Sequence, residues 1–185
     1  MFTLHKFVSP AGLRAACLLC LSAAITLPVH AGRLRYAHGN AEGGVTQGAV
    51  VGHRGEAGKG VRGHRVVTDG QGNARATSGA AYQGANGGSL RRAGQTTRAA
   101  DGSMNHASGL DASGAKGSVQ SQGSTTRDAS GNVTQNRSTS GSSASTGNSF
   151  TATESYIKGE GVTRSVSCFD AAGAPIACPK GSPNR

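Results

Sequence analysis

Strongly apolar residues are concentrated at the start of the chain. Residues 15–29 (AACLLCLSAAITLPV) form an apolar run that follows two basic residues, and Ala31 supplies the small residue expected at a leader cleavage site. The run is shorter than the ~20 apolar residues that span a bilayer. Residues 1–31 are therefore expected to be a secretory signal peptide, cleaved between Ala31 and Gly32. Export to the periplasm, the outer surface or the medium follows, with no transmembrane segment in the mature chain.

Beyond residue 31 the pattern becomes short, polar and rich in small residues. Leu, Ile, Val and Phe number 17 among 154 residues, whereas Gly, Ser, Thr, Asn and Gln number 76. At ~1.5–3 kcal/mol each, 17 buried apolar side chains cannot offset the conformational entropy of ordering such a chain, which exceeds ~150 kcal/mol. Either much of this low-complexity, glycine-rich chain is disordered, or its order comes from backbone hydrogen bonding in a thin, repetitive β architecture.

A degenerate repeat of 29 residues runs through the middle of the chain. Residues 94–98 (GQTTR) recur as 123–127 (GSTTR), and 88–90 (GSL) recur as 117–119 (GSV). This periodicity divides the chain into a basic, Gly-rich flexible segment (32–58), β repeats (59–149) and a C-terminal cap (150–185).

A second recurring pattern, D-x-x-G, predicts turns. Asp at the first position of a type I turn accepts hydrogen bonds from the backbone that follows, and Gly at the fourth position adopts positive φ without strain. The result is a three-residue β-hairpin loop. The expected pairs are Asp69 and Gly72, Asp111 and Gly114, Asp128 and Gly131, and Asp170 and Gly173.

The spacing of these turns indicates strands of about 6–10 residues, a normal strand length. Val, Thr and Ser enrich the intervening stretches, and no window combines helical periodicity with caps. The predicted fold is all-β, either an antiparallel meander or a β-solenoid with small residues on both faces, with substantial disorder. A chain that is disordered alone and orders only on assembly is the alternative.

The C-terminal segment is expected to be a hairpin closed by a disulfide. Because Cys17 and Cys20 lie in the leader, the mature chain keeps only Cys168 and Cys178, an even pair in an oxidising compartment. In the simplest register Asp170 pairs with Ala174, which places Cys168 opposite Ile176 rather than Cys178. The loop is then wider, or Pro175 bulges the returning strand.

Positive charge is concentrated in the N-terminal half of the mature chain. Residues 32–98 carry a net charge of +7, and residues 99–185 carry +1. Such a segment attracts anionic polysaccharide, lipopolysaccharide or extracellular DNA without sequence readout, although solubility during export is an equally good explanation. The candidate polyanion-binding residues are Arg54, Lys59, Arg62, Arg65, Arg75, Arg91, Arg92 and Arg98.

Metal, cofactor and enzyme chemistry lack support in the sequence. The histidines at 38, 53, 64 and 106 match no local ligand spacing, and neither calcium-loop pattern occurs. No nucleophile elbow or phosphate-binding loop is present, so we expect a non-enzyme without cofactors.

In composition and repeat style, residues 39–150 resemble the Gly/Ser/Thr-rich secreted repeat proteins of bacterial surfaces, such as adhesin passengers and matrix-fibre subunits. The resemblance implies a structural or adhesive role and self-assembly. The leading hypothesis is a secreted or surface-associated scaffold that contacts anionic envelope or matrix polymers. The alternative is a periplasmic or secreted binding module whose C-terminal hairpin recognises a protein partner.

Overall fold

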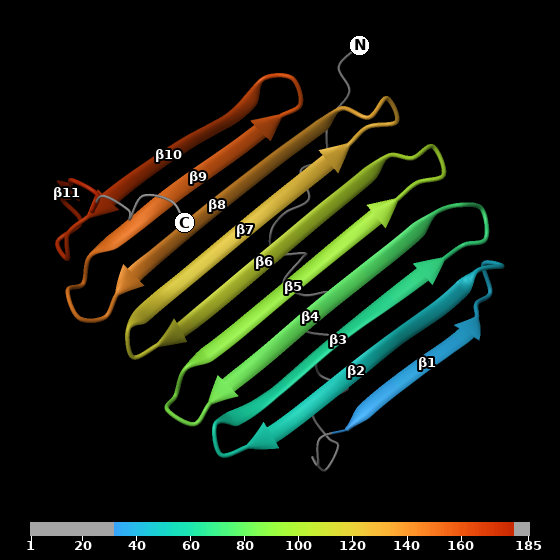
Figure 1. Cartoon of the computed structure of the whole chain (residues 1–185), viewed down its shortest axis with the longest axis horizontal. Helices are drawn as coiled ribbons and strands as arrows, with labels where there is room; N and C mark the ends of the chain where they lie inside the picture. Colours follow the sequence, from blue (N-terminus) through green and yellow to red (C-terminus); the bar gives the residue numbers. More distant parts are fainter. Residues whose placement is uncertain (1–31, 180–185) are drawn as a thin grey trace.

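Residues 32–179 form a single antiparallel meander in the computed structural model, and the strands lie side by side in chain order (Figure 1). The predicted leader and the Ala31 side of its cleavage site lie outside these residues. The strands are β1 (Arg33–Gly39), β2 (Val45–Gly55), β3 (Gly58–Thr68), β4 (Ala74–Gly84), β5 (Ser89–Arg98), β6 (Met104–Gly114), β7 (Gly117–Arg127), β8 (Val133–Ser143), β9 (Ser149–Ile157), β10 (Gly161–Phe169) and β11 (Pro175–Ile176). The all-β prediction is confirmed, as a meander rather than a solenoid.

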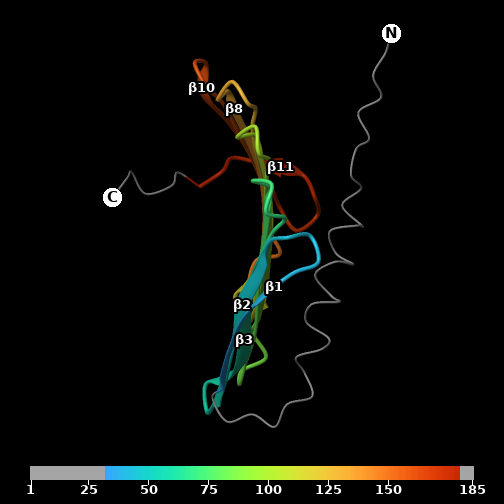
Figure 2. The same cartoon turned by 90° about the vertical axis from the view of Figure 1, so that its right-hand side faces the viewer.

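The sheet is one layer thick, and seen edge-on it is a narrow, twisted band (Figure 2). Within residues 32–179 the only buried hydrophobic residues are Ala49 and Cys168, each 8% exposed. Each interior strand hydrogen bonds to two neighbours along its length, so the ladders satisfy backbone groups that an apolar core would otherwise have to shelter. This is the thin β architecture that the shortage of apolar residues predicts.

The three-residue hairpin loop forms as predicted at two of the D-x-x-G sites. In the β7–β8 loop the Gly131 N–H donates to the Asp128 carbonyl oxygen (3.0 Å), and Gly131 has a φ of 81°. The β10–β11 loop repeats this geometry with Asp170 and Gly173. At Asp69 the loop also closes, but a second glycine, Gly70, adopts positive φ beside Gly72, so its backbone path differs.

The prediction of a turn at Asp111 is wrong. Asp111 lies inside β6, where it pairs with Arg91 on one side and Gln120 on the other. The strand continues to Gly114, and a two-residue connection joins it to Gly117 (φ 138°). A Cβ at Gly117 would lie 1.9 Å from the Ser142 carbonyl oxygen, so the required glycine is the one after the turn.

The strands are longer than predicted and begin earlier in the chain. Six of them span 11 residues, because glycines that suggested interruptions lie within strands. Residues 32–58, expected as a flexible segment, contain β1 and β2. Each 29-residue repeat corresponds to one β-hairpin. No helix within residues 32–179 is long and apolar enough to cross a membrane.

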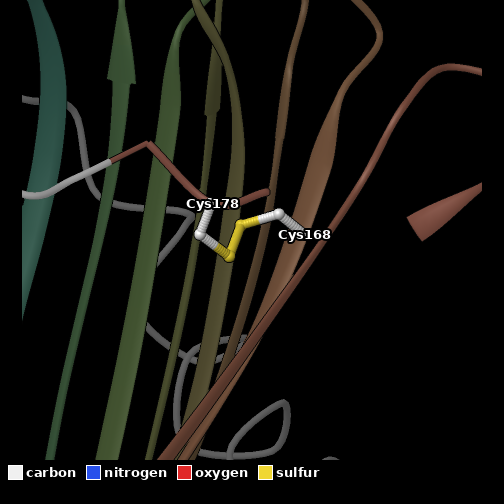
Figure 3. The surroundings of a disulfide bond; sticks show 2 residues. All are labelled: Cys168 and Cys178. Carbon is white, nitrogen blue, oxygen red and sulfur yellow. A yellow bond between two sulfur atoms is a disulfide. The ribbon is translucent and has the colours of Figure 1, made fainter. Parts of the chain in front are cut away.

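The predicted disulfide between Cys168 and Cys178 is present, with Cα atoms 5.2 Å apart (Figure 3). The simplest register also holds, with Cys168 opposite Ile176 and the Asp170 N–H donating to the Ala174 carbonyl oxygen (2.9 Å). Neither a wider loop nor a bulge at Pro175 is needed. Since β11 ends at Ile176, the next two residues are free to bring Cys178 back to Cys168.

Candidate polyanion-binding groove

Three arginines lie in one row across the N-terminal half of the sheet. Residues that pair directly across an antiparallel sheet project from the same face, so the register traces a row from strand to strand. The row from β1 to β7 consists of Arg33, Val51, Arg62, Ala80, Arg92, Leu110 and Ser121. Arginine therefore occurs on β1, β3 and β5, at every second strand. We call the face from which these side chains project the groove face.

A fourth arginine reaches this row from the neighbouring one. Arg137 on β8 pairs with Gly123 on β7, and its Nη1 donates a hydrogen bond to the Ser121 hydroxyl oxygen (3.1 Å). A Cβ on Gly123 would lie 3.3 Å from Nη2, so the glycine leaves room for the guanidinium to lie over β7. We call Arg33, Arg62, Arg92 and Arg137 the arginine row. The positions on β1, β3 and β5 are two strand spacings apart, about 9–10 Å, and the Arg137 side chain reaches back from β8 to β7.

A shallow groove of about 640 Å³ runs across the sheet beneath the arginine row. Small residues, among them Ser78, Gly94 and Ser108, form its floor, and His64 and His106 contribute imidazoles. The Thr96 hydroxyl lies 2.8 Å from His106 Nδ1, which orients that ring and leaves Nε2 free of this contact. The groove is open along its length, as a site for a polymer must be.

The groove face has a large excess of positive charge. Its strand positions carry Arg33, Arg35, Arg62, Arg92, Arg98, Arg127, Arg137 and Arg164 against one carboxylate, Glu154. Glu154 pairs with Arg164 (2.8 Å), the one ion pair within residues 32–179. No carboxylate lines the groove, and all four members of the arginine row are exposed. They are free to pair with anions from solution.

The structure divides the predicted polyanion-binding residues between the two faces. Arg62, Arg92 and Arg98 lie on the groove face, whereas the opposite face carries Arg54, Lys59, Arg65, Arg75 and Arg91. On that opposite face Asp111 lies beside Arg91, and Arg75 donates to the Gln95 side-chain oxygen (2.8 Å). The prediction compared the net charge of the two halves of the mature chain. It did not include Arg33 or Arg137 among the candidate polyanion-binding residues. The period of two within each strand was the signal that separates the faces.

Two further titratable groups, Asp69 and Asp128, stabilise hairpin loops. The Asn73 side-chain amide, followed by the Gln71 backbone N–H, lowers the pKa of the Asp69 carboxyl below its ordinary range. The Asn132 side-chain amide likewise lowers the pKa of Asp128. Both carboxylates belong to turns rather than to the groove. The described part of the chain gathers no group of three or more His, Cys, Asp or Glu residues that would hold a metal ion.

Comparison with protein-family models, curated proteins and solved structures finds no match for this chain. The feature that distinguishes this chain is its own geometry, an open single-layer meander with an arginine row across one face and no carboxylate in the groove.

Proposed function

We propose that this protein is a secreted or surface-associated structural and adhesive scaffold that binds linear anionic polysaccharide across its groove face. The observation that carries the proposal is the arginine row, which has four exposed arginines across the groove and no carboxylate among the residues that line it. Guanidinium forms paired hydrogen bonds with carboxylate, sulfate or phosphate, so each arginine offers one anion-binding position.

The spacing of the row favours a polysaccharide over a nucleic acid. Row positions about 9–10 Å apart on β1, β3 and β5 match the length of about two sugar units, so every second acid of a polyuronate such as alginate would meet one arginine. Phosphates along a DNA strand recur every ~3.4 Å, so the row would leave most of them unpaired. The groove also lacks the stacking aromatics with which proteins hold single-stranded bases.

Affinity in such a site comes from repetition. An exposed ion pair contributes roughly 0–1 kcal/mol and is screened by salt, so no single arginine holds the polymer. Linked contacts along one chain act at a high effective concentration, which allows a polymer to bind where an isolated sugar acid does not. The predicted export of the protein supports the proposal, because acidic polysaccharides are abundant at bacterial surfaces.

The test is retention of the full chain on an immobilised acidic polysaccharide such as alginate, with neutral dextran as the matched support. We expect retention on alginate only, and elution as sodium chloride is raised. Equal retention on dextran, or retention that salt does not reverse, would overturn the proposal. Double-stranded DNA serves as a competitor. If DNA displaces alginate when the phosphate concentration is lower than the uronate concentration, the groove binds nucleic acid in preference to polysaccharide.

A further inference from the structure

Among residues 32–179, the meander leaves two strand edges without a partner. Within this range β1 pairs only with β2, and on its outer side β10 pairs with β11 only at Cys168 and Phe169. All seven residues of Gly161–Ser167 are exposed, as are six of the seven residues of β1. Unpaired N–H and C=O groups along an exposed edge are a template for another strand.

The two free edges lie at the same level of the sheet. Followed strand by strand, the register places Arg33 in the same row as Val166, and His38 in the same row as Gly161. β11 covers β10 only from Cys168 onward. The β1 strand begins at Arg33, in the row of Val166, so it does not extend to the rows that β11 occupies. The β1 strand of a second copy would therefore fit the length of β10 that β11 leaves free.

Direction matches as well as level. Strand direction alternates from β1 to β10, so a second copy's β1 placed beside β10 continues the antiparallel order (Figure 1). An even number of full strands is what allows identical copies to add end to end in this way. Had the count been odd, the added strand would run parallel to its neighbour.

The hydrogen-bonding positions also match. The Gly52 N–H donates to the Gly32 carbonyl oxygen, so even-numbered residues at β1 bond inward and odd-numbered ones point outward. The Asp170 N–H donates to the Ala174 carbonyl oxygen, so even-numbered residues of β10 point outward. The outward residues are Arg33, Arg35, Ala37 and Gly39 on β1 and Val162, Arg164 and Val166 on β10. All belong to the groove face, so joined copies would keep that face continuous.

Apolar side chains are most exposed at these same edges. Leu34 on β1 is 60% exposed, and Val162 and Val166 on β10 are 55% and 57% exposed, the highest values among large hydrophobic residues in the described chain. A strand added at either edge would cover them, which supplies a driving force besides the new backbone hydrogen bonds.

We infer that copies of this chain assemble head to tail, with β1 of one copy adding to the free length of β10 in the next. The contact is heterologous, because it uses different surfaces on the two copies, and it grows into a filament where the rotation between copies does not close a ring. In the register that continues the rows, Arg35 faces Arg164 of the neighbour. This repulsion is screened by salt, so salt strengthens assembly while it weakens polysaccharide binding.

The test uses two variants that each block one edge. Val166→Pro removes an outward N–H from β10, and Ala37→Pro removes one from β1; neither N–H bonds within the sheet, and edge strands tolerate proline. By light scattering and sedimentation in high salt, we expect the parent chain to form species that grow with concentration. Each variant alone should stay monomeric, and an equimolar mixture should form dimers and nothing larger.

A parent chain that remains monomeric at every concentration would overturn the inference. So would a single proline variant that assembles as the parent does, or a mixture that remains monomeric although both variants keep the β spectrum of the parent in circular dichroism. Arg35→Glu provides a second test that remains valid if the proline variants do not fold. It replaces a like-charge pair by an opposite-charge pair, so the protein concentration at which assembly begins should fall by a factor of about three or more. An unchanged or higher threshold for Arg35→Glu would contradict the proposed register.

Discussion

The guanidinium of Arg137 donates a hydrogen bond across the sheet to the hydroxyl of Ser121, 3.1 Å away. The side chain reaches that hydroxyl by lying over Gly123, the residue with which Arg137 pairs. A strand-interior glycine with ordinary φ thus sets the position of a charge four rows of the ladder away from the last pair before the nearest turn, Arg127 and Val133. The charge pattern of the groove depends on where such small residues lie as much as on where the arginines lie.

Gly123→Val should weaken polysaccharide binding without weakening the sheet. A branched side chain would displace the Arg137 guanidinium from its place over β7, while valine suits a strand better than glycine does. We expect an affinity for alginate about two- to fivefold lower, as for the loss of one exposed ion pair, and a melting temperature equal to or above that of the parent. An unchanged affinity would show that Arg137 does not contribute to the site.

Reduction of the disulfide should loosen only the C-terminal end. The bridge closes a short loop and contributes about 2–3 kcal/mol by chain entropy. Because β11 spans two residues while β1 to β9 pair along long ladders, circular dichroism should show the same β spectrum with and without reductant. Amide exchange should accelerate at Cys168 and Ile176, which pair across β10 and β11. A random-coil spectrum in either condition would contradict the folded meander.

Acidification should destabilise the hairpin loops. Side-chain amides and backbone N–H groups lower the carboxyl pKa values of Asp69 and Asp128 in the folded state, relative to the ordinary value of 3.8. Their contribution to stability is therefore fully present above pH 3.8 and is lost as the pH falls through the lowered folded values. Thermal unfolding followed by circular dichroism should show the loss.

The matched control for this pH effect is the double variant Asp69→Asn, Asp128→Asn. It keeps oxygen acceptors in both loops but has no charge to titrate there. It should unfold at a lower temperature than the parent at neutral pH, and its melting temperature should fall less on acidification. An identical decline in parent and variant would assign the acid sensitivity to other groups.

The sequence was sufficient to predict the fold class, because the shortage of apolar residues and the recurring turns both point to thin β structure. The turns at Asp128 and Asp170 followed from local chemistry, since Asp and Gly there satisfy one loop by themselves. The prediction of a turn at Asp111 rested on the same local pattern and was wrong. The neighbours of Asp111 in space, Arg91 and Gln120, lie on other strands and hold it in the ladder, which no local pattern discloses.

The site was less predictable than the fold. The sequence gives the arginines but not the register, and a shift of one residue moves every side chain of a strand to the other face. Arg91 and Arg92 are adjacent in sequence and were grouped together, yet they project from opposite faces. Arg137 lies in the half of the chain with little net charge and joins the row only because Gly123 lies beneath it.

We propose that the arginine row, rather than net charge, binds the polymer. Arg62→Gln with Arg92→Gln removes two members of the row, whereas Arg65→Gln with Arg91→Gln removes the same charge from the same strands, β3 and β5, on the opposite face. Alginate affinity measured by titration calorimetry at one salt concentration compares them directly. We predict a loss of about tenfold or more for the first pair, as two linked ion pairs are removed, and less than about twofold for the second. Equal losses in the two double variants would show that net charge, and not the arginine row, binds the polymer.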